Sequence, residues 1–330
     1  MKNDSNSLGG KMIFILQGGR CGNQLFNYAF ARQIQYKYPD QKICVCASGL
    51  EKKQGEYGFF WEDSLKHFNV SPYETWGEND VDCLKQGTLF QRMAWNLWGI
   101  VAKLDRRKII PFSGEIFKKK LFKILSKAGV FYNIFDGTAP YSIREHKHYF
   151  VYGRFEDEKW FEGKHDDLCE ELKPKVDLIP NEKLMQQIES LNSVCVSLRN
   201  WTIDVTDQKN LANRTVCNAE YYKKAIQYMK DHVENPAFIV FSDDVEWGKQ
   251  IVSSVAGDSL VIAESNLDDV AEKLRYMSSC KHFILANSTF SWWSQYLSQN
   301  KDKIVVSPSQ WFHNEKGHPL IGKDWLLLYD

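Results

Sequence analysis

Three polar residues, Asn287, Ser288 and Thr289, stand between two apolar runs and have the side chains of an anion-binding turn. Residues 282–285 predict a short buried strand before them, and residues 290–300 have the spacing of a helix after them. The first N–H groups of a helix have no partner within it, and the helix dipole adds positive potential there. Hydroxyl groups beside those donors favour phosphate. The turn therefore predicts a site for a nucleotide pyrophosphate.

Arg199 and Asn200 follow a second predicted strand at residues 194–198. An arginine at the carboxyl end of such a strand points into the region where α/β sheets bind ligands. Its planar guanidinium suits phosphate oxygens, although a surface salt bridge is the alternative for Arg199. Asp204, a few residues later, is a candidate general base or the cap of a turn.

Ser242, Asp243 and Asp244 follow a third predicted strand at residues 238–241. A carboxylate there could accept hydrogen bonds from guanine or from ribose hydroxyls. Capping of the next helix by Ser242 or Asp243 is the alternative, and both could hold. The adjacent aspartates also suggest a metal-binding site. We disfavour this alternative because the sequence places no third ligand near them.

The first turn of the chain, after the predicted strand 12–16, is rich in glycine. Its spacing departs from the G-x-G-x-x-G fingerprint of dinucleotide sites. We expect Gly19, Gly22, Asn23 and Gln24 to line the floor of a ligand cleft, with Asn23 as the N-cap of the next helix. A purely structural strand-to-helix turn is the alternative.

The elements that must position these residues alternate regularly in the second half of the chain. Short buried strands separated by amphipathic helices predict a parallel sheet covered on both faces, which is a Rossmann-like domain. The expected strands are 194–198, 238–241, 260–262, 282–285 and 304–306, and the expected helices are 219–231, 245–255, 267–278 and 290–300.

The first half begins with the same pattern and then becomes irregular. Strand 12–16, helix 23–38 and strand 43–46 are followed by a long helical and basic region at residues 88–129. Residues 174–193 should lead across to the second half. We predict two α/β domains that face each other across a cleft: residues 1–190, on the acceptor side and with a helical insertion, and residues 191–330, which bind the nucleotide.

Charge and hydropathy indicate which partners and which cellular compartment to expect. The 330 residues contain 42 basic and 42 acidic side chains, so net charge gives no reason to expect nucleic acid. The apolar run at residues 12–16 is too short for a signal peptide, and two N-glycosylation patterns fall within the expected site, so we expect a cytoplasmic protein. The basic stretch 103–127 is either a solvated helix face or a shallow contact with an anionic inner-membrane surface.

Several segments, taken in order, resemble the α-1,2-fucosyltransferases of glycosyltransferase family 11. Residues 19–31 (GRCGNQLFNYAFA) are similar to the family's opening motif, and residues 286–293 (ANSTFSWW) to a later one. Residues 152–157 resemble the family's G-Y-F-Q-[DS] segment. Further similar segments are 221–226, 241–244, 280–282 and 308–311, so that the resemblance runs from residue 12 to about residue 325.

The resemblance implies a GT-B-type fold with two Rossmann-like domains and GDP-L-fucose as donor. It also implies inversion at the anomeric carbon without a required metal ion or other cofactor, and the 2-hydroxyl of a terminal galactose as acceptor. By position, Arg199 would grip the GDP phosphates and Asp243 would lie near guanine. The pyrophosphate loop would comprise Ser288, Thr289, Phe290 and Ser291.

The sequence departs from the family's H-x-R-R-x-D motif, because Ser197, Asn200 and Thr202 replace its histidine, second arginine and aspartate. Asp204, two residues later, is the candidate to replace the lost carboxylate. We therefore expect a transferase that passes L-fucose from GDP-fucose to a galactose-terminated oligosaccharide or lipid-linked glycan. The alternatives are the same fold with another GDP-hexose donor, and a non-catalytic glycan- or nucleotide-binding protein.

Overall fold

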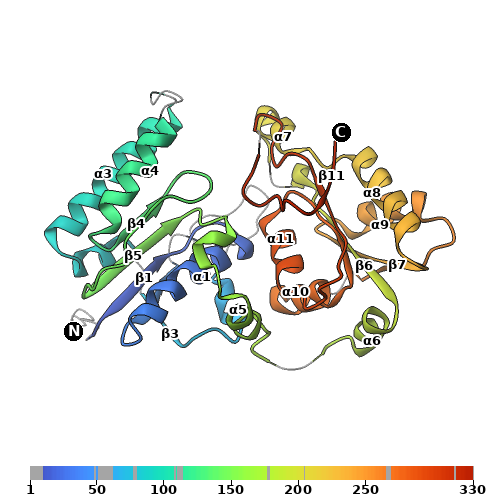
Figure 1. Cartoon of the computed structure of the whole chain (residues 1–330), viewed down its shortest axis with the longest axis horizontal. Helices are drawn as coiled ribbons and strands as arrows, with labels where there is room; N and C mark the ends of the chain where they lie inside the picture. The colour runs from blue at the N-terminus through green and yellow to red at the C-terminus, as the bar shows by residue number, and fades with distance from the viewer. Residues whose placement is uncertain are drawn as a thin grey trace, which may run out of the picture.

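A computed structural model describes residues 10–47, 50, 62–76, 80–107, 109, 114–176, 179–203, 205–264, 269–315 and 317–329. Two parallel sheets dominate it, one in each half of the chain, and helices cover both (Figure 1). The predicted α/β class with two Rossmann-like domains, the arrangement of a GT-B fold, is thereby confirmed.

The first sheet has the strand order β3-β2-β1-β5-β4, and all its neighbours are parallel. Its central strand β1 is buried along its whole length, as an uninterrupted apolar run requires. The elements are β1 (Met12–Leu16), α1 (Cys21–Lys37), β2 (Lys42–Cys46), η1 (Ser64–His67), β3 (Tyr73–Thr75), η2 (Asp80–Gln86), α3 (Leu89–Arg106), α4 (Gly114–Ser126), β4 (Val130–Asn133) and β5 (His148–Gly153).

The helical insertion is a pair of helices rather than one long helix. Thr88 begins α3 with a capping box, in which the Thr88 and Gln91 side chains each bond the other's backbone N–H. Both α3 and α4 pack against β4, the edge strand of the first sheet. The pair therefore lies at the outer end of the first domain, on the side away from the second domain (Figure 1).

The second sheet has the order β11-β10-β9-β6-β7-β8, again parallel throughout. Each predicted strand and helix of this half is present with shifted ends. Between the two sheets lie η3 (Glu158–Phe161) and α5 (His165–Glu171), whose buried residues belong to the first core. The elements of the second half are α6 (Glu182–Ser190), β6 (Asn192–Leu198), η4 (Trp201–Ile203), α7 (Gln208–Arg214), α8 (Ala219–His232), β7 (Pro236–Ser242), α9 (Val245–Ala256), β8 (Val261–Ala263), α10 (Val270–Ser279), β9 (His282–Ile284), α11 (Thr289–Tyr296), β10 (Val305–Pro308) and β11 (Leu326–Leu328).

The segment expected to cross between the domains contains α6, which packs on α10 and β6 of the second sheet. Its apolar residues Leu184, Met185 and Ile188 share a core with Cys195 and Phe283. The connection between the two sheets therefore precedes α6, and the boundary at residue 190 itself stays a prediction.

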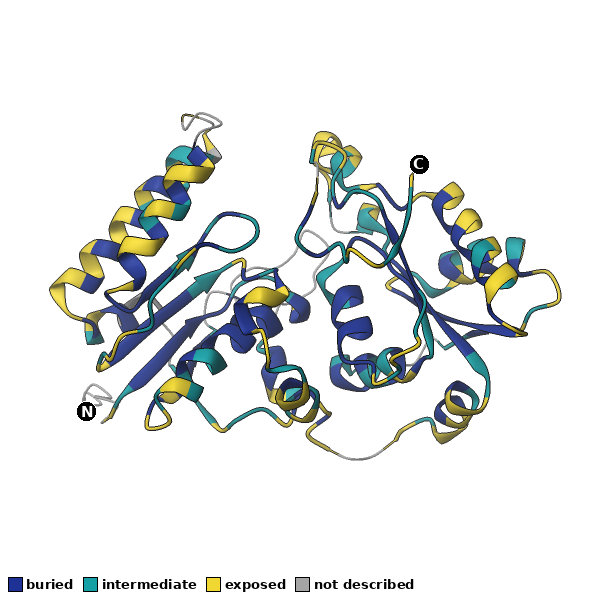
Figure 2. Cartoon of the chain, viewed as in Figure 1, coloured by how far each residue is buried: buried dark blue, intermediate teal, exposed yellow. Residues whose placement is uncertain are grey.

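Aromatic side chains join the two domains. The Phe26 ring of α1 lies 4.8 Å from that of Trp293 in α11, and the Phe161 ring lies 5.6 Å from Trp293 in a stacked arrangement. Helix α11 is buried along most of its length between the two sheets (Figure 2). The tryptophan pair at residues 292 and 293 therefore belongs to a core shared by both domains.

Candidate functional site

In each sheet, some of the strands lie on one side of the first strand and the rest on its other side, which makes a topological switch point. Polar residues follow the strands at both switch points. In the second sheet β6 lies between β7 and β9, and in the first sheet β1 lies between β2 and β5. Ligands of open parallel sheets bind at the carboxyl ends of the strands flanking such a point. The candidate site therefore comprises the loops that follow β6 and β9, together with those that follow β1 and β5.

Arg199 follows β6 and pairs with Asp243, which follows the neighbouring strand β7. Asp243 Oδ1 also accepts a hydrogen bond of 2.9 Å from the backbone N–H of Asn200. The Asn200 side-chain amide donates to Asp244 Oδ2 at 3.3 Å. These bonds fix two of the predicted segments against each other at the strand ends.

Two further arginines that sequence reasoning missed surround Arg199. The guanidinium carbons of Arg199 and Arg214 each lie 4.9 Å from the ring centroid of Trp201. Burial and, to a smaller extent, the positive charges of Arg20 and Arg214 together lower the pKa of Arg199 to about 9. A concentration of positive charge at one point favours an anionic ligand. Arg20 could have been found, because it lies inside the opening motif.

Asn287 holds this arrangement together from the loop after β9. Its Oδ1 accepts a hydrogen bond from Trp201 Nε1 at 3.2 Å. Its Nδ2 donates to the carbonyl oxygens of Arg214, at 2.8 Å, and of Trp311, at 2.9 Å. Asn287 is buried, so its amide positions Trp201 and Arg214 rather than facing outward. Residue type alone does not distinguish an asparagine that binds a ligand from one that positions neighbouring side chains.

The first turn of α11 has the predicted strand-to-helix geometry, with the helix shortened to Thr289–Tyr296. Ser288 is the N-cap residue, yet its side chain makes no capping hydrogen bond. The Ser291 hydroxyl accepts from the backbone N–H of Ala286 at 3.2 Å and is buried. Ser288 and Phe290 are half-buried.

The loop after β1 lies directly against this turn. The Thr289 hydroxyl donates to Asn23 Oδ1 at 2.8 Å, and Trp293 Nε1 donates to the carbonyl of Gly22 at 3.0 Å. A Cβ on Gly22 would lie 2.6 Å from Phe290 N, so only glycine allows this approach. Gly22 and Asn23 thus form part of the contact between the domains.

The expected N-cap at Asn23 was wrong, and so was the alternative that Ser242 or Asp243 caps the helix after β7. Helix α1 begins at Cys21 after Arg20, so Asn23 is not its N-cap; the Asn23 side chain bonds Thr289 instead. Helix α9 is capped by Asp244, whose Oδ1 accepts from Trp247 N at 3.1 Å, because Asp243 is engaged with Arg199.

Gln24 and Ser242 support the backbone of their loops. Gln24 is fully buried and donates to the carbonyls of Gly19, at 3.1 Å, and Glu62, at 2.9 Å. Gly19 has φ +75°, a conformation that favours glycine. The Ser242 hydroxyl accepts from the Asp244 backbone N–H at 3.1 Å. Asp204 lies outside the described residues.

Glu156, which sequence reasoning missed, stands in the loop after β5. It is half-buried, and its carboxylate has no hydrogen-bond partner among the described residues. Burial raises its pKa, the positive charges of Arg154 and Arg214 oppose the rise and the negative charge of Asp136 adds to it, so that the pKa of Glu156 lies at about 7. A signal was present in the sequence, because Glu156 occupies the place of the glutamine in the G-Y-F-Q-[DS] segment.

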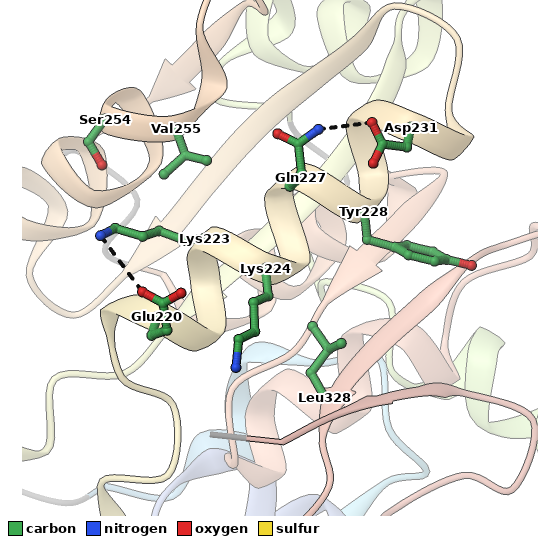
Figure 3. Close-up of a pocket in the computed structure, with 9 residues that line it drawn as sticks. All are labelled: Glu220, Lys223, Lys224, Gln227, Tyr228, Asp231, Ser254, Val255 and Leu328. Carbon is green, nitrogen blue, oxygen red and sulfur yellow. Dashed lines mark hydrogen bonds and ion pairs between the residues drawn. The ribbon is translucent and has the colours of Figure 1, made fainter.

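Two surface depressions lie away from these loops. One has a volume of about 660 Å³ and is lined mainly by exposed residues of α8 (Figure 3). Its polar side chains bond one another, as in Gln227 Nε2 to Asp231 Oδ1 at 2.9 Å. A second depression of about 400 Å³ lies between η3, α11 and residues 319–325. Neither includes a residue predicted for the site.

In the described part of the chain, no three His, Cys, Asp or Glu side chains are grouped so that they could hold a metal ion. None of the helices there has both the length and the apolar character needed to cross a membrane.

Comparisons with known proteins found a family model that matches more than half of the chain, together with similar proteins and similar folds. Residues 132–326 match the sequence model described as "Glycosyl transferase family 11". The chain is 24% identical to the Escherichia coli "O-antigen biosynthesis glycosyltransferase WbnK", over 96% of this chain and all of that protein. It is 32% identical to an E. coli "Alpha-1,2-colitosyltransferase", over 50% of this chain and 56% of that protein. Among solved structures, the fucosyltransferase NodZ from Bradyrhizobium superposes with a TM-score of 0.45 at 12% identity, covering 88% of this chain and 93% of NodZ.

Proposed function

Since this chain belongs to glycosyl transferase family 11, we propose that it moves L-fucose from GDP-β-L-fucose to the 2-hydroxyl of a terminal galactoside, with inversion. The observation that carries the donor half of the proposal is the cluster of Arg199, Arg214 and Arg20 at the switch points of both sheets. A diphosphate leaving group gains negative charge as its bond to the sugar lengthens. Preorganised cations in a partly desolvated site stabilise that charge without a metal ion.

Arg199 is proposed to bind the diphosphate, and Asp243 to hold Arg199 in place. The first N–H groups of α11, which have no acceptor within the helix, would add further donors to the phosphates. A carboxylate has about four acceptor positions, so Asp243 and Asp244 retain capacity for guanine or ribose beyond the bonds they already make. The loss of the family's second arginine at Asn200 is offset in this proposal by Arg214.

The acceptor hydroxyl must lose a proton as it attacks, and two carboxylates are candidates to receive it. Glu156 is supported by its position after β5, beside β1 at the first sheet's switch point, and by its lack of a hydrogen-bond partner among the described residues. A carboxylate with a pKa near neutrality suits a general base. We propose Glu156 in this role and test it against Asp204, the candidate from sequence.

One observation favours a second donor. The relative with 32% identity is a colitosyltransferase, and this chain departs from the family at Ser197, Asn200 and Thr202. The same site could therefore take another GDP-hexose, with colitose as one example. A non-catalytic nucleotide- or glycan-binding role would leave Glu156 without a function.

The proposed acceptor is a galactose-terminated oligosaccharide or a lipid-linked glycan, handled in the cytoplasm. The name of the WbnK relative refers to O-antigen biosynthesis, which supports a glycan acceptor. Asn287, one of the N-glycosylation patterns, is buried with its amide engaged, which supports a compartment without that modification.

Nucleotide binding tests the donor site directly. We expect GDP, but not UDP, to raise the melting temperature of the wild-type protein, by an amount corresponding to about 3 kcal/mol at a hundredfold excess over Kd. Arg199→Ala should lose this stabilisation while remaining folded. Arg144→Ala, which removes an exposed arginine elsewhere, is the matched control. Equal stabilisation of both variants would refute the role given to Arg199.

A further inference from the structure

The helices α3 and α4 have an apolar face that the rest of the protein does not cover. Thirteen large apolar side chains are exposed in the described structure, and nine of them lie between residues 89 and 124. Five belong to α3 and are between 42% and 66% exposed: Leu89, Phe90, Met93, Leu97 and Ile100. At 3.6 residues per turn, these five positions fall within an arc of about 100°. Such a concentration on one surface indicates an interaction site.

This exposed arc is separate from the face of α3 that packs on the protein. Ala94, Trp98 and Val101 are buried and face the first core. Arg92 and Lys103 lie on the other side of the exposed arc, both exposed. The helix is therefore apolar on two adjoining faces and basic along the remaining edge, although only one apolar face is needed for packing.

The neighbouring helix α4 continues the same surface. Ile116, Phe117 and Ile124 are each more than half exposed, and the exposed Lys120 and Lys123 lie between them on the helix. Figure 2 shows exposed residues running along α3 and α4 at the outer end of the first domain. Lys118 is not part of this surface, because it is buried and paired with Asp105 at 3.2 Å.

The charge of this region identifies the partner. Residues 89–127 contain ten lysines and arginines but only two acidic residues, in a chain whose net charge is zero. An apolar helical face bordered by lysine and arginine is the pattern of a helix that lies in the interface of an anionic membrane. A second copy of the chain would bring two such basic surfaces together, which like-charge repulsion disfavours.

We propose that the outer face of α3 and α4 docks on an anionic lipid bilayer. The apolar side chains enter the boundary between headgroups and acyl chains, and the lysines contact lipid phosphates. Both helices pack on β4, which pairs with β5, the strand that precedes Glu156. If the proposed function holds, docking presents the acceptor side of the enzyme to lipid-linked glycans.

Vesicle binding by the whole purified chain tests this proposal without reference to activity, so its failure would leave the proposed function untouched. The probes are vesicles of phosphatidylcholine alone and of phosphatidylcholine with phosphatidylglycerol, each separated by flotation at low and high salt. We expect binding to the anionic vesicles only, weakened by salt. The variant Lys120→Glu with Lys123→Glu should bind at least about thirtyfold less tightly.

The apolar contribution is tested by Leu97→Gln with Ile100→Gln, which should weaken binding roughly tenfold or more. Matched controls change similar exposed residues of the second domain: Leu260→Gln for the apolar pair and Lys249→Glu with Lys301→Glu for the basic pair. Both controls should bind as the wild type does. A cooperative thermal unfolding transition at a temperature close to that of the wild type verifies that each variant is folded.

Three results would overturn the proposal. The first is that the wild type binds anionic vesicles no more tightly than neutral ones, and the second is that both α3/α4 variants bind anionic vesicles as tightly as the wild type. The third is a wild-type protein that binds no vesicles and is a dimer in light scattering, which Leu97→Gln with Ile100→Gln converts to a monomer. That outcome would assign the face to a second copy of the chain.

Discussion

Replacing Gly22 by alanine should loosen the contact between the two domains. A Cβ at this position would lie 2.6 Å from Phe290 N and 2.7 Å from the carbonyl carbon of Thr289. Both atoms belong to the backbone of α11, so no side-chain rotation relieves the overlap and the helix must move. That movement strains the 3.0 Å hydrogen bond from Trp293 Nε1 to Gly22 and the 2.8 Å bond from Thr289 to Asn23.

The expected magnitude combines three contributions. Overpacking a buried contact costs about 1–3 kcal/mol. Weakening two hydrogen bonds adds about 1 kcal/mol. Alanine has a higher helix propensity than glycine, which stabilises α1 by at most about 1 kcal/mol. The free energy of unfolding should therefore fall by about 1–3 kcal/mol, and the clash outweighs the gain in propensity.

Urea unfolding, followed by the fluorescence of the tryptophans at the domain contact, measures this change. The matched control is Gly99→Ala in α3, where an added Cβ meets nothing within 4 Å. Only propensity acts at Gly99, so that variant should be as stable as the wild type or up to about 1 kcal/mol more stable. If Gly22→Ala proved as stable as Gly99→Ala, the close approach of the two domains would be refuted.

The site itself gives three further predictions. Arg199→Ala should lower kcat by about a hundredfold or more, because the leaving diphosphate loses its main cation, and near-normal turnover would contradict this. If Glu156 is the base, kcat should rise with pH around a midpoint near 7, and Glu156→Gln should lose both the inflection and most of the activity. Glu315→Gln is the control, since Glu315 also has a pKa raised to about 7 and lies near Asp136, Arg154 and Glu156. If Glu315→Gln or Asp204→Asn lost the inflection while Glu156→Gln kept it, the proton of the acceptor would pass to that other carboxylate. The third prediction concerns stability. Between pH 4.5 and about 7, Glu156 keeps its proton in the folded protein but releases it in the unfolded chain, so the free energy of unfolding falls as pH rises through that window. Glu156→Gln should therefore be more stable than the wild type above pH 7 and no more stable below pH 4.5.

The fold was largely readable from the sequence, because its strands are short apolar runs and its helices have a clear period. The predicted helix caps were wrong where a tertiary partner competes with the local capping preference of a side chain. Asn23 has the side chain of an N-cap, but a tertiary partner, Thr289, engages it instead. Asp244 caps α9 because Asp243, an equally good cap by type, is held by Arg199.

The candidate site was readable only in part, because residue type does not reveal which partner a side chain finds. The turn after β9 was identified from Asn287, Ser288 and Thr289, yet the buried amide of Asn287 serves the protein itself. Arg214 and Glu156 were missed because each reaches the site from a different element. Their meeting depends on how the two domains pack, which no local pattern encodes.

Acceptor-dependent release of GDP from GDP-fucose tests the central claim most directly. The assay uses a small panel of β-galactosides, including lactose and galactosyl-N-acetylhexosamines, first without added metal and then with EDTA. The account predicts GDP release that requires a galactoside and persists in EDTA. Absence of release with every galactoside, in a protein that GDP still stabilises, would contradict the proposed transfer of fucose.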